Sequence, residues 1–339
     1  MKKRGDASSH GIDISDNYPQ NANMRQMDFP ISPMRRFFVK MSVVLVGLLI
    51  GLVMAEIVLR IYYHSREDRT VYWKNKEGFR DVDHSVAKPP GTLRVAFQGD
   101  SFTYGEGVDF KQIFSTRVGE ILQRKMPGRK VETLNFGIRG LDVFGDLHNI
   151  REHVLKYDPD EIVFSYVLND FSDKRMDREF IGAIRREVDR FKIFRWFEKY
   201  SKLAYFTDWG LYQLFSDARR MHMQWLNDSF DPAKNPRYHE MRDALEEIVR
   251  IVSRKSSVVV FFPYLVAPDE EHIGFYNRAK HLVKSLCDEY KCPFLEVLPL
   301  LKSRPYYRWW VSADNHHPNA KAHRLIAEAI AAKILENPN

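Results

Sequence analysis

Short apolar runs that alternate with helical patterns constrain this fold more than any other feature. A run that is apolar along its whole length is typical of a strand buried on both faces, and parallel strands need crossover helices between them. The sequence therefore predicts an α/β domain with a parallel sheet covered on both faces. The expected strands are residues 93–98, 131–136, 161–168, 256–264 and 292–298, and the expected helices are residues 111–125, 141–157, 241–253, 276–290 and 319–335.

One segment interrupts the alternation. Residues 171–240 contain no convincing strand pattern and are rich in aromatic residues, especially at 191–197 and 205–209. We expect a helical insertion here. Its aromatic side chains either pack on the core, which is the usual fate of such residues, or form a lid or a membrane-facing surface.

The N-terminal part of the chain has a different character. Residues 1–36 are polar and without an apolar period, which predicts a disordered tail. In residues 41–59 Glu56 is the one charge, and about 19 residues at about 1.5 Å each span roughly 28 Å, close to the hydrocarbon thickness of a bilayer. We therefore expect residues 37–63 to form a transmembrane signal anchor that contacts the membrane through residues 41–62.

A cleaved signal peptide is the alternative, because residues 53–55 have the small-residue character of a cleavage site. Basic residues lie on both sides of the apolar run, namely Arg35, Arg36 and Lys40 before it and Arg60, Arg66 and Arg69 after it. The positive-inside rule therefore only weakly favours a cytoplasmic N-terminus. On that orientation a stalk at residues 64–92 leads to a catalytic domain at residues 93–339 outside the cytoplasm.

Charge and cysteine content exclude several function classes. The net charge of +7 is spread along the chain, so no nucleic-acid partner is expected. Cys287 and Cys292 have the wrong spacing for a redox pair or a zinc site, and they are either a small disulfide or two reduced thiols. No metal or cofactor is expected, since the histidines at 316, 317 and 323 are accompanied only by Asp314. The glycines at 105 and 107 lack the third glycine of a dinucleotide site.

Polar residues that suit acyl transfer follow the expected strands. Ser101 ends the block Gly-Asp-Ser after residues 93–98, and His317 lies in the loop before the last helix. Loops at the carboxyl ends of parallel strands meet at one edge of a sheet. We expect Asp314, one helical turn before His317, to orient the imidazole while His317 takes the proton of Ser101.

Donors for a developing oxyanion are available in the same loops. We expect the backbone N–H groups of Ser101 and Gly140 and the side-chain amide of Asn169 to supply them. Gly137 is an alternative to Gly140. Each residue also has a plain structural reading, as a helix cap for Ser101, a turn for Asn169 and a helix start for Asp314.

The order of these blocks resembles the SGNH hydrolase superfamily, the GDSL-like lipases and esterases, over residues 93–335. The resemblance implies a flavodoxin-like three-layer α/β/α domain with a five-stranded parallel sheet, and no cofactor. It assigns catalysis to Ser101, Asp314 and His317, and the oxyanion hole to Ser101, Gly140 and Asn169. Tyr166 and Leu168 stand where the family commonly has glycine, which leaves the local pocket shape open.

We therefore predict a membrane-anchored serine esterase that works through an acyl-enzyme. Its substrate is an ester-bearing lipid, glycan or small molecule. An O-acyltransferase or O-acetyltransferase acting on an extracellular glycan is the first alternative, because both reactions share the acyl-enzyme. A non-catalytic, membrane-tethered binding protein with the same fold is the second.

Overall fold

The computed structural model describes residues 32–66, 72–171, 174–194, 196–215, 217–255, 257–263, 273–301, 306–312 and 315–336. The chain divides into two compact units, residues 1–55 and 56–339. Helix α1 (Pro33–Arg66) crosses this division, and its part Pro33–Tyr62 is long and apolar enough to span a membrane. The larger unit holds everything else described below.

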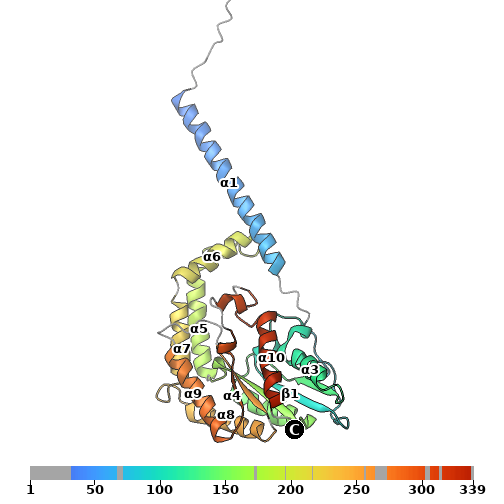
Figure 1. Ribbon diagram of the computed structural model, residues 1–339. Helices are drawn as coiled ribbons and strands as arrows, with labels where there is room; N and C mark the ends of the chain where they lie inside the picture. Colours follow the sequence, from blue (N-terminus) through green and yellow to red (C-terminus); the bar gives the residue numbers. More distant parts are fainter. Residues whose placement is uncertain are drawn as a thin grey trace, which may run out of the picture. The chain divides into compact units, whose positions relative to one another are not determined.

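Five parallel strands form the sheet of the larger unit, with helices around it (Figure 1), and their order is β2-β1-β3-β4-β5. Phe97 in the middle of β1 pairs with Asn135 on one side and Val163 on the other. This order is that of a flavodoxin-like sheet, so the predicted fold class is confirmed. The strands are β1 (Leu93–Gly99), β2 (Val131–Asn135), β3 (Glu161–Val167), β4 (Val258–Phe262) and β5 (Phe294–Glu296).

Helices cover both faces of the sheet. Side chains alternate between the faces of a strand, so Val95 and Phe97 pack with α3 (Phe114–Lys125) and α10 (Ala320–Glu336), while Ala96 faces the opposite layer. That layer consists of α4 (Val143–Asn149), α8 (Tyr238–Ser253) and α9 (Ile273–Glu289). The three inner strands β1, β3 and β4 are therefore buried along their whole length, as their composition predicts, whereas the edge strands β2 and β5 are partly exposed.

Several element boundaries differ from the predicted ones. The helix expected at 111–125 is split, because Ile113 is extended between the 3-10 turn η1 (Phe110–Gln112) and α3. The helix expected at 141–157 continues after α4 as the π-turn η2 (Ile150–Val154) and the 3-10 turn η3 (Leu155–Tyr157). The fifth strand is shorter than expected: Pro293, which lacks an N–H donor, precedes it, and the 3-10 turn η5 (Leu298–Leu300) begins two residues after its end.

The insertion is helical in its described part, with α5 (Lys174–Phe191), α6 (Lys202–Phe215) and α7 (Ala218–Ser229). Its aromatic residues have two fates. Phe171 and Phe230 are buried and stack on each other, whereas Trp196 is 87% exposed. Core packing therefore explains only part of the aromatic content.

Two further segments bear on the predictions. Cys287 and Cys292 are buried free thiols and not a disulfide.

Phe79 and Arg80, in the segment expected to form a stalk, are buried against the domain. The Arg80 guanidinium donates to the carbonyl oxygens of Tyr104, Gly105 and Val108, so this segment braces the loop that follows Ser101.

Candidate active site

The loop after β1 holds Ser101 in a tightly built turn. Gly99 has φ +155°, and a Cβ there would lie 2.5 Å from Thr103 Oγ1 and 2.7 Å from the Ser165 carbonyl oxygen. Asp100 is buried and caps the short helix α2 (Ser101–Tyr104) by accepting from the Phe102 N–H at 2.9 Å. The sequence Gly-Asp-Ser therefore places a half-buried hydroxyl at the carboxyl end of β1.

The structure brings Ser101 and His317 together across 216 residues. His317 Nε2 lies 2.8 Å from Ser101 Oγ, and His317 Nδ1 lies 2.6 Å from Asn315 Oδ1. The Asn315 carbonyl oxygen can only accept, so the Nδ1 atom carries the proton and Nε2 presents its lone pair to the serine. This tautomer is the one that a general base needs.

Asn315 was not predicted as a site residue, whereas Asp314, which was, lies outside the described residues. The Asn315 side chain also accepts from the backbone N–H of His317 at 3.2 Å. It therefore fixes both the ring and the backbone of the histidine. The signal available in the sequence was only its position two residues before His317.

Asn169 lies close to the serine. It belongs to the 3-10 turn η4 (Leu168–Asp170) at the end of β3. Its Nδ2 atom donates to Asp100 Oδ2 at 3.4 Å, and Ser101 Oγ lies 3.2 Å from the same oxygen. Two predicted site residues that follow different strands therefore lie against one carboxyl oxygen.

The two candidate glycines of the loop after β2 differ in their surroundings. The Gly137 N–H donates to Asn135 Oδ1 at 2.9 Å, and a Cβ at Gly137 would lie 2.2 Å from the Tyr104 nitrogen. Gly137 thus serves close packing. Gly140 is exposed, has φ +69° and has open space around its Cβ position, which suits a donor that faces a substrate.

Charges near the site favour a neutral imidazole. Burial, and then the positive charges of Arg139 and His316, lower the pKa of His317 to about 4. Arg139 is held by an ion pair with Glu106 and lies over the rings of Tyr72 and Tyr104, 4.6 and 4.5 Å from their centroids. His317 is therefore unprotonated at neutral pH and able to accept a proton.

Buried carboxyl groups lie behind the serine. Burial raises the pKa of Asp100 to about 6, and burial together with the charge of Asp100 raises the pKa of Asp170 well above its usual range. Burial also raises the pKa of Asp146, which accepts from Gln98 at 2.7 Å. At neutral pH Asp146 and Asp170 are therefore largely protonated and uncharged, whereas Asp100 is mostly ionised.

The two other candidate histidines, His316 and His323, pack against aromatic residues. His323 Nδ1 accepts from the Phe114 N–H at 3.1 Å and its ring stacks on Phe114, so it belongs to the core. His316 stacks on Trp310 with 3.9 Å between the ring centroids. Within the described residues no three His, Cys, Asp or Glu side chains are grouped so as to hold a metal ion.

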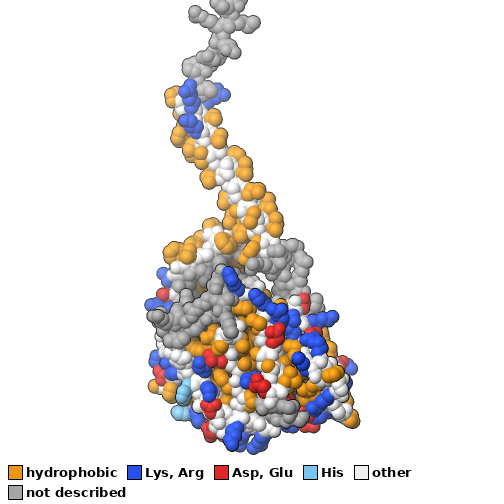
Figure 2. All heavy atoms as spheres, viewed as in Figure 1, with side chains coloured by type: hydrophobic (Ala, Val, Ile, Leu, Met, Phe, Trp, Pro, Cys, Tyr) orange, Lys and Arg blue, Asp and Glu red, His pale blue; other side chains and the backbone are white. Residues whose placement is uncertain are grey.

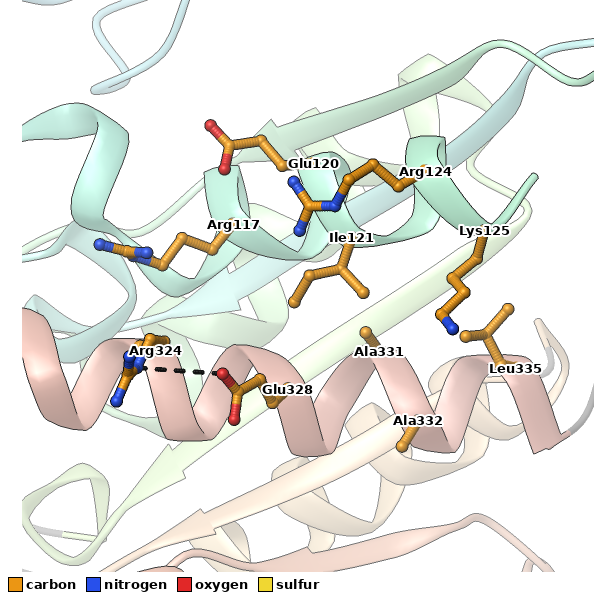
Figure 3. A pocket seen from close by; sticks show the side chains of 10 residues that line it. All are labelled: Arg117, Glu120, Ile121, Arg124, Lys125, Arg324, Glu328, Ala331, Ala332 and Leu335. Carbon is orange, nitrogen blue, oxygen red and sulfur yellow. Dashed lines mark ion pairs between the residues drawn. The ribbon is translucent and has the colours of Figure 1, made fainter. Parts of the chain in front are cut away.

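A surface hollow of about 330 Å³ lies between α3 and α10 (Figure 3), and Ser101 is not among its lining residues. Arg324 and Glu328 form an ion pair at its rim, with 3.9 Å between their charged atoms. Its lining includes Arg117, Arg124 and Lys125. A second hollow of about 600 Å³ lies between α5 and α7 and is lined in part by Phe180 and Trp225. Neither contains a predicted site residue.

Fold and site together define a class: a doubly wound α/β protein with a serine and a histidine paired at the carboxyl ends of its strands, as serine hydrolases have. Residues 97–325 match the model of the GDSL-like lipase/acylhydrolase family, and the chain belongs to this family. It is an ester-cleaving hydrolase by that membership. A search of curated protein sequences found no match to this chain.

Solved structures with a similar fold include several esterases. A two-domain esterase active on acetylated mannans is 16% identical, with a TM-score of 0.45; the match covers 72% of this chain and 49% of that one, about half its length. A lipase from a goat rumen metagenome is 14% identical, with coverages of 71% and 97% and a TM-score of 0.48. An acetylxylan esterase from Geobacillus stearothermophilus is 17% identical, with coverages of 71% and 94% and a TM-score of 0.45.

Proposed function

We propose that this enzyme hydrolyses a carboxylic ester through an acyl-enzyme on Ser101. The observation that carries the proposal is the 2.8 Å contact between Ser101 Oγ and His317 Nε2. In acylation the hydroxyl proton moves to Nε2 while Oγ bonds to the ester carbonyl carbon. The imidazolium then protonates the leaving alcohol, and a water molecule, deprotonated by the same nitrogen, releases the acid.

The negatively charged oxygen that forms in each tetrahedral intermediate needs hydrogen-bond donors. We assign these to the backbone N–H groups of Ser101 and Gly140 and to the amide of Asn169. The proximity of Asn169 Nδ2 and Ser101 Oγ, which both lie against Asp100 Oδ2, supports this assignment. Donors aimed at developing charge lower the barrier most when they are held in place before the reaction.

His317 needs an acceptor at Nδ1 throughout the cycle. Asp314 remains our predicted carboxylate for this role, and the 2.6 Å contact with Asn315 Oδ1 adds a second positioning residue. Asp314→Asn and Asn315→Ala separate the two contributions. If Asp314 stabilises the imidazolium, the first variant loses kcat, whereas loss of orientation alone is expected from the second.

Substitution of the site residues tests the mechanism. Ser101→Ala is expected to lower kcat for a p-nitrophenyl ester on the order of 10⁶-fold, because the members of such a unit act together. Asn169→Ala should cost about 10²- to 10³-fold through the loss of one oxyanion donor. Ser285→Ala, an exposed serine that donates to the Leu282 carbonyl oxygen of its own helix, is the control.

Covalent labelling separates catalysis from binding. A fluorophosphonate should label the wild-type protein and the Ser285→Ala control but not Ser101→Ala. If Ser101→Ala kept wild-type turnover, the catalytic assignment would be wrong. An unlabelled and inactive wild-type protein would favour the binding-protein alternative. Product analysis with and without an oligosaccharide acceptor then distinguishes hydrolysis from acyl transfer, since only transfer yields acylated oligosaccharide.

The proposal includes location and substrate class. We propose that Pro33–Tyr62 anchors the enzyme in a membrane, supported by its length and apolar composition, and that the esterase unit lies outside the cytoplasm. Its substrate would be an ester-bearing lipid, glycan or small molecule on that side. A C-terminal alkaline phosphatase fusion should be active, and a silent fusion together with an active cytoplasmic reporter would reverse this topology.

A further inference from the structure

The insertion exposes an unusual group of large apolar side chains. We call residues 192–215, apart from 195, the insertion tip; it comprises the turn between α5 and α6 and the whole of α6. Figure 2 shows hydrophobic side chains over α6. The exposed ones are Ile193 (66%), Phe194 (41%), Trp196 (87%), Phe197 (63%), Tyr200 (68%), Phe206 (43%), Leu214 (78%) and Phe215 (67%).

The backbone of the tip is held by specific hydrogen bonds. Asp208 of α6, which is only 3% exposed, accepts from the N–H groups of Ile193 and Phe194 at 3.1 and 2.9 Å. The Phe197 N–H donates to the Phe194 carbonyl oxygen at 2.7 Å. The backbone of the turn is therefore fixed by hydrogen bonds, while its aromatic side chains are exposed.

A second set of contacts joins the tip to the C-terminal part of α1, which belongs to the same compact unit. Glu56 accepts from the N–H groups of Lys202 and Leu203 at 3.1 and 2.9 Å, at the start of α6. Arg60 donates to the Tyr200 carbonyl oxygen at 2.5 Å. The one carboxylate of the apolar run at 41–59 is thus engaged by the tip.

Both α1 residues that contact the tip belong to the C-terminal end of the candidate span. Glu56 and Arg60 precede Tyr62, the last residue of that span, by about 9 and about 3 Å of helix at about 1.5 Å per residue. If the span crosses a bilayer, this end of the helix approaches the boundary between hydrocarbon and headgroups.

The side chains of the tip have the composition of a membrane interface. Tryptophan, tyrosine and phenylalanine are exposed next to Lys192 and Lys199, and the Lys199 ammonium lies 5.5 Å from the Tyr200 ring centroid. Amphipathic aromatic rings and lysines are enriched at headgroup level, where the ring is buried and the ammonium reaches phosphate. In water the same rings would leave a large apolar patch exposed.

We propose that the insertion tip lies in the membrane interface and is a second attachment of the esterase unit to the bilayer, in addition to the span. This inference rests on the proposed anchor. The aromatic side chains at 194, 196 and 197 enter the boundary between headgroups and acyl chains. The contacts of Glu56 and Arg60 then hold the unit close to the bilayer instead of leaving it on a free tether.

Nitroxide depth measurements on the full chain test this. The chain is reconstituted in vesicles of phosphatidylethanolamine and phosphatidylglycerol, with a spin label at Phe197→Cys, and the native cysteines are protected by burial. Leu49→Cys in the apolar run is the control for the anchor. Asp243→Cys on α8, whose side chain is 73% exposed, is the aqueous control.

The label at 197 is expected to collide with oxygen several-fold more, relative to a water-soluble nickel chelate, than the label at 243. If the label at 197 has the same collision ratio as the label at 243 while the label at 49 is in lipid, the inference is wrong and the anchor stands. If 49 is also in water, both the anchor and the inference fail. If the label at 197 is shielded from both reagents, protein covers the patch, from a second copy or another partner, and the bilayer proposal is wrong.

Tryptophan quenching provides a measurement without a label. Brominated lipids should quench the wild-type protein more than Trp196→Phe, because Trp196 is then the residue that reaches the acyl chains. Trp225→Phe is the matched control, since Trp225 packs on Phe180 in the insertion. Equal quenching of wild type and Trp196→Phe would overturn the proposal. Both variants should keep activity on a water-soluble ester.

Discussion

Replacement of Arg139 by glutamine tests the electrostatic control of His317. The pKa of His317 is lowered to about 4, first by burial and then by the positive charge of Arg139. Removal of that charge stabilises the imidazolium and raises the pKa. Glu106, which loses its ion-pair partner, acts in the same direction because its negative charge is no longer compensated.

The burial of His317 limits how far its pKa can rise in the variant. Burial remains in the variant, so the pKa should stay below the ordinary value of about 6.5. A rise of about one unit, the order expected for one nearby like charge, moves the acidic limb of the profile from about pH 4 to about pH 5. At pH 4 the neutral fraction would then fall from about one half to about one tenth, roughly a fivefold loss of activity, while at pH 7 it would not change.

The assay is kcat/KM against pH for a fluorogenic ester, since this ratio reports the free enzyme. Arg151→Gln is the matched control. Arg151 is 49% exposed and ion-paired with Glu247, compared with 48% for Arg139 and its pair with Glu106. Thermal melting of both variants checks the fold, because Arg139 also lies over two tyrosine rings. An acidic limb unchanged by Arg139→Gln, or moved equally by Arg151→Gln, would refute the reasoning.

Two further predictions concern stability and thiol chemistry. Gly99→Ala should destabilise the domain by about 2 to 4 kcal/mol, from overpacking and a strained backbone, because its Cβ would meet Thr103 Oγ1 and the Ser165 carbonyl oxygen; Gly128→Ala, with nothing within 4 Å, should change little in the same denaturant titration. Cys287 and Cys292, as buried free thiols, should react with a thiol reagent only after unfolding without reductant, and no reaction then would indicate a disulfide.

The fold was predictable because its three inner strands, β1, β3 and β4, are buried along their whole length. All seven residues of β3 are buried, and an apolar run of that kind has few places to go except the middle of a covered sheet. Helix ends were less predictable. Ile113 is apolar and fits the helical period, yet its ψ of 142° interrupts the helix, since a single backbone angle leaves no mark on periodicity.

The candidate site was predictable as far as chain order and strand ends determine it. Ser101 and His317 were expected to meet and are in contact. The Nδ1 acceptor was not predictable from spacing. Asn315 contacts Nδ1, and the direction of its side chain depends on backbone angles of a loop, which spacing does not reveal; Asp314 lies outside the described residues. Arg139 shows the same limit, because a charge one residue before a predicted donor gives no indication that it acts on the histidine.

Aromatic composition likewise could not separate burial from exposure. Phe171 and Phe230 stack in the core while Phe197 is exposed, although all three belong to the same insertion. The difference comes from Asp208 and Glu56, whose carboxylates hold the tip by its backbone N–H groups. Carboxylates that act as backbone acceptors are read from a structure and not from hydropathy.

The resting geometry also indicates how the proposed mechanism would begin. Asp100 Oδ2 accepts from Asn169 Nδ2 at 3.4 Å and lies 3.2 Å from Ser101 Oγ, so two groups assigned to the proposed mechanism lie against one buried carboxyl whose pKa burial raises to about 6. The bond from Asn169 is long and therefore weak. A substrate carbonyl that accepts from Asn169 therefore displaces a weak contact, while His317, at 2.8 Å, already holds the serine hydroxyl. The site is arranged so that binding, and not a rearrangement of the protein, supplies the missing acceptor.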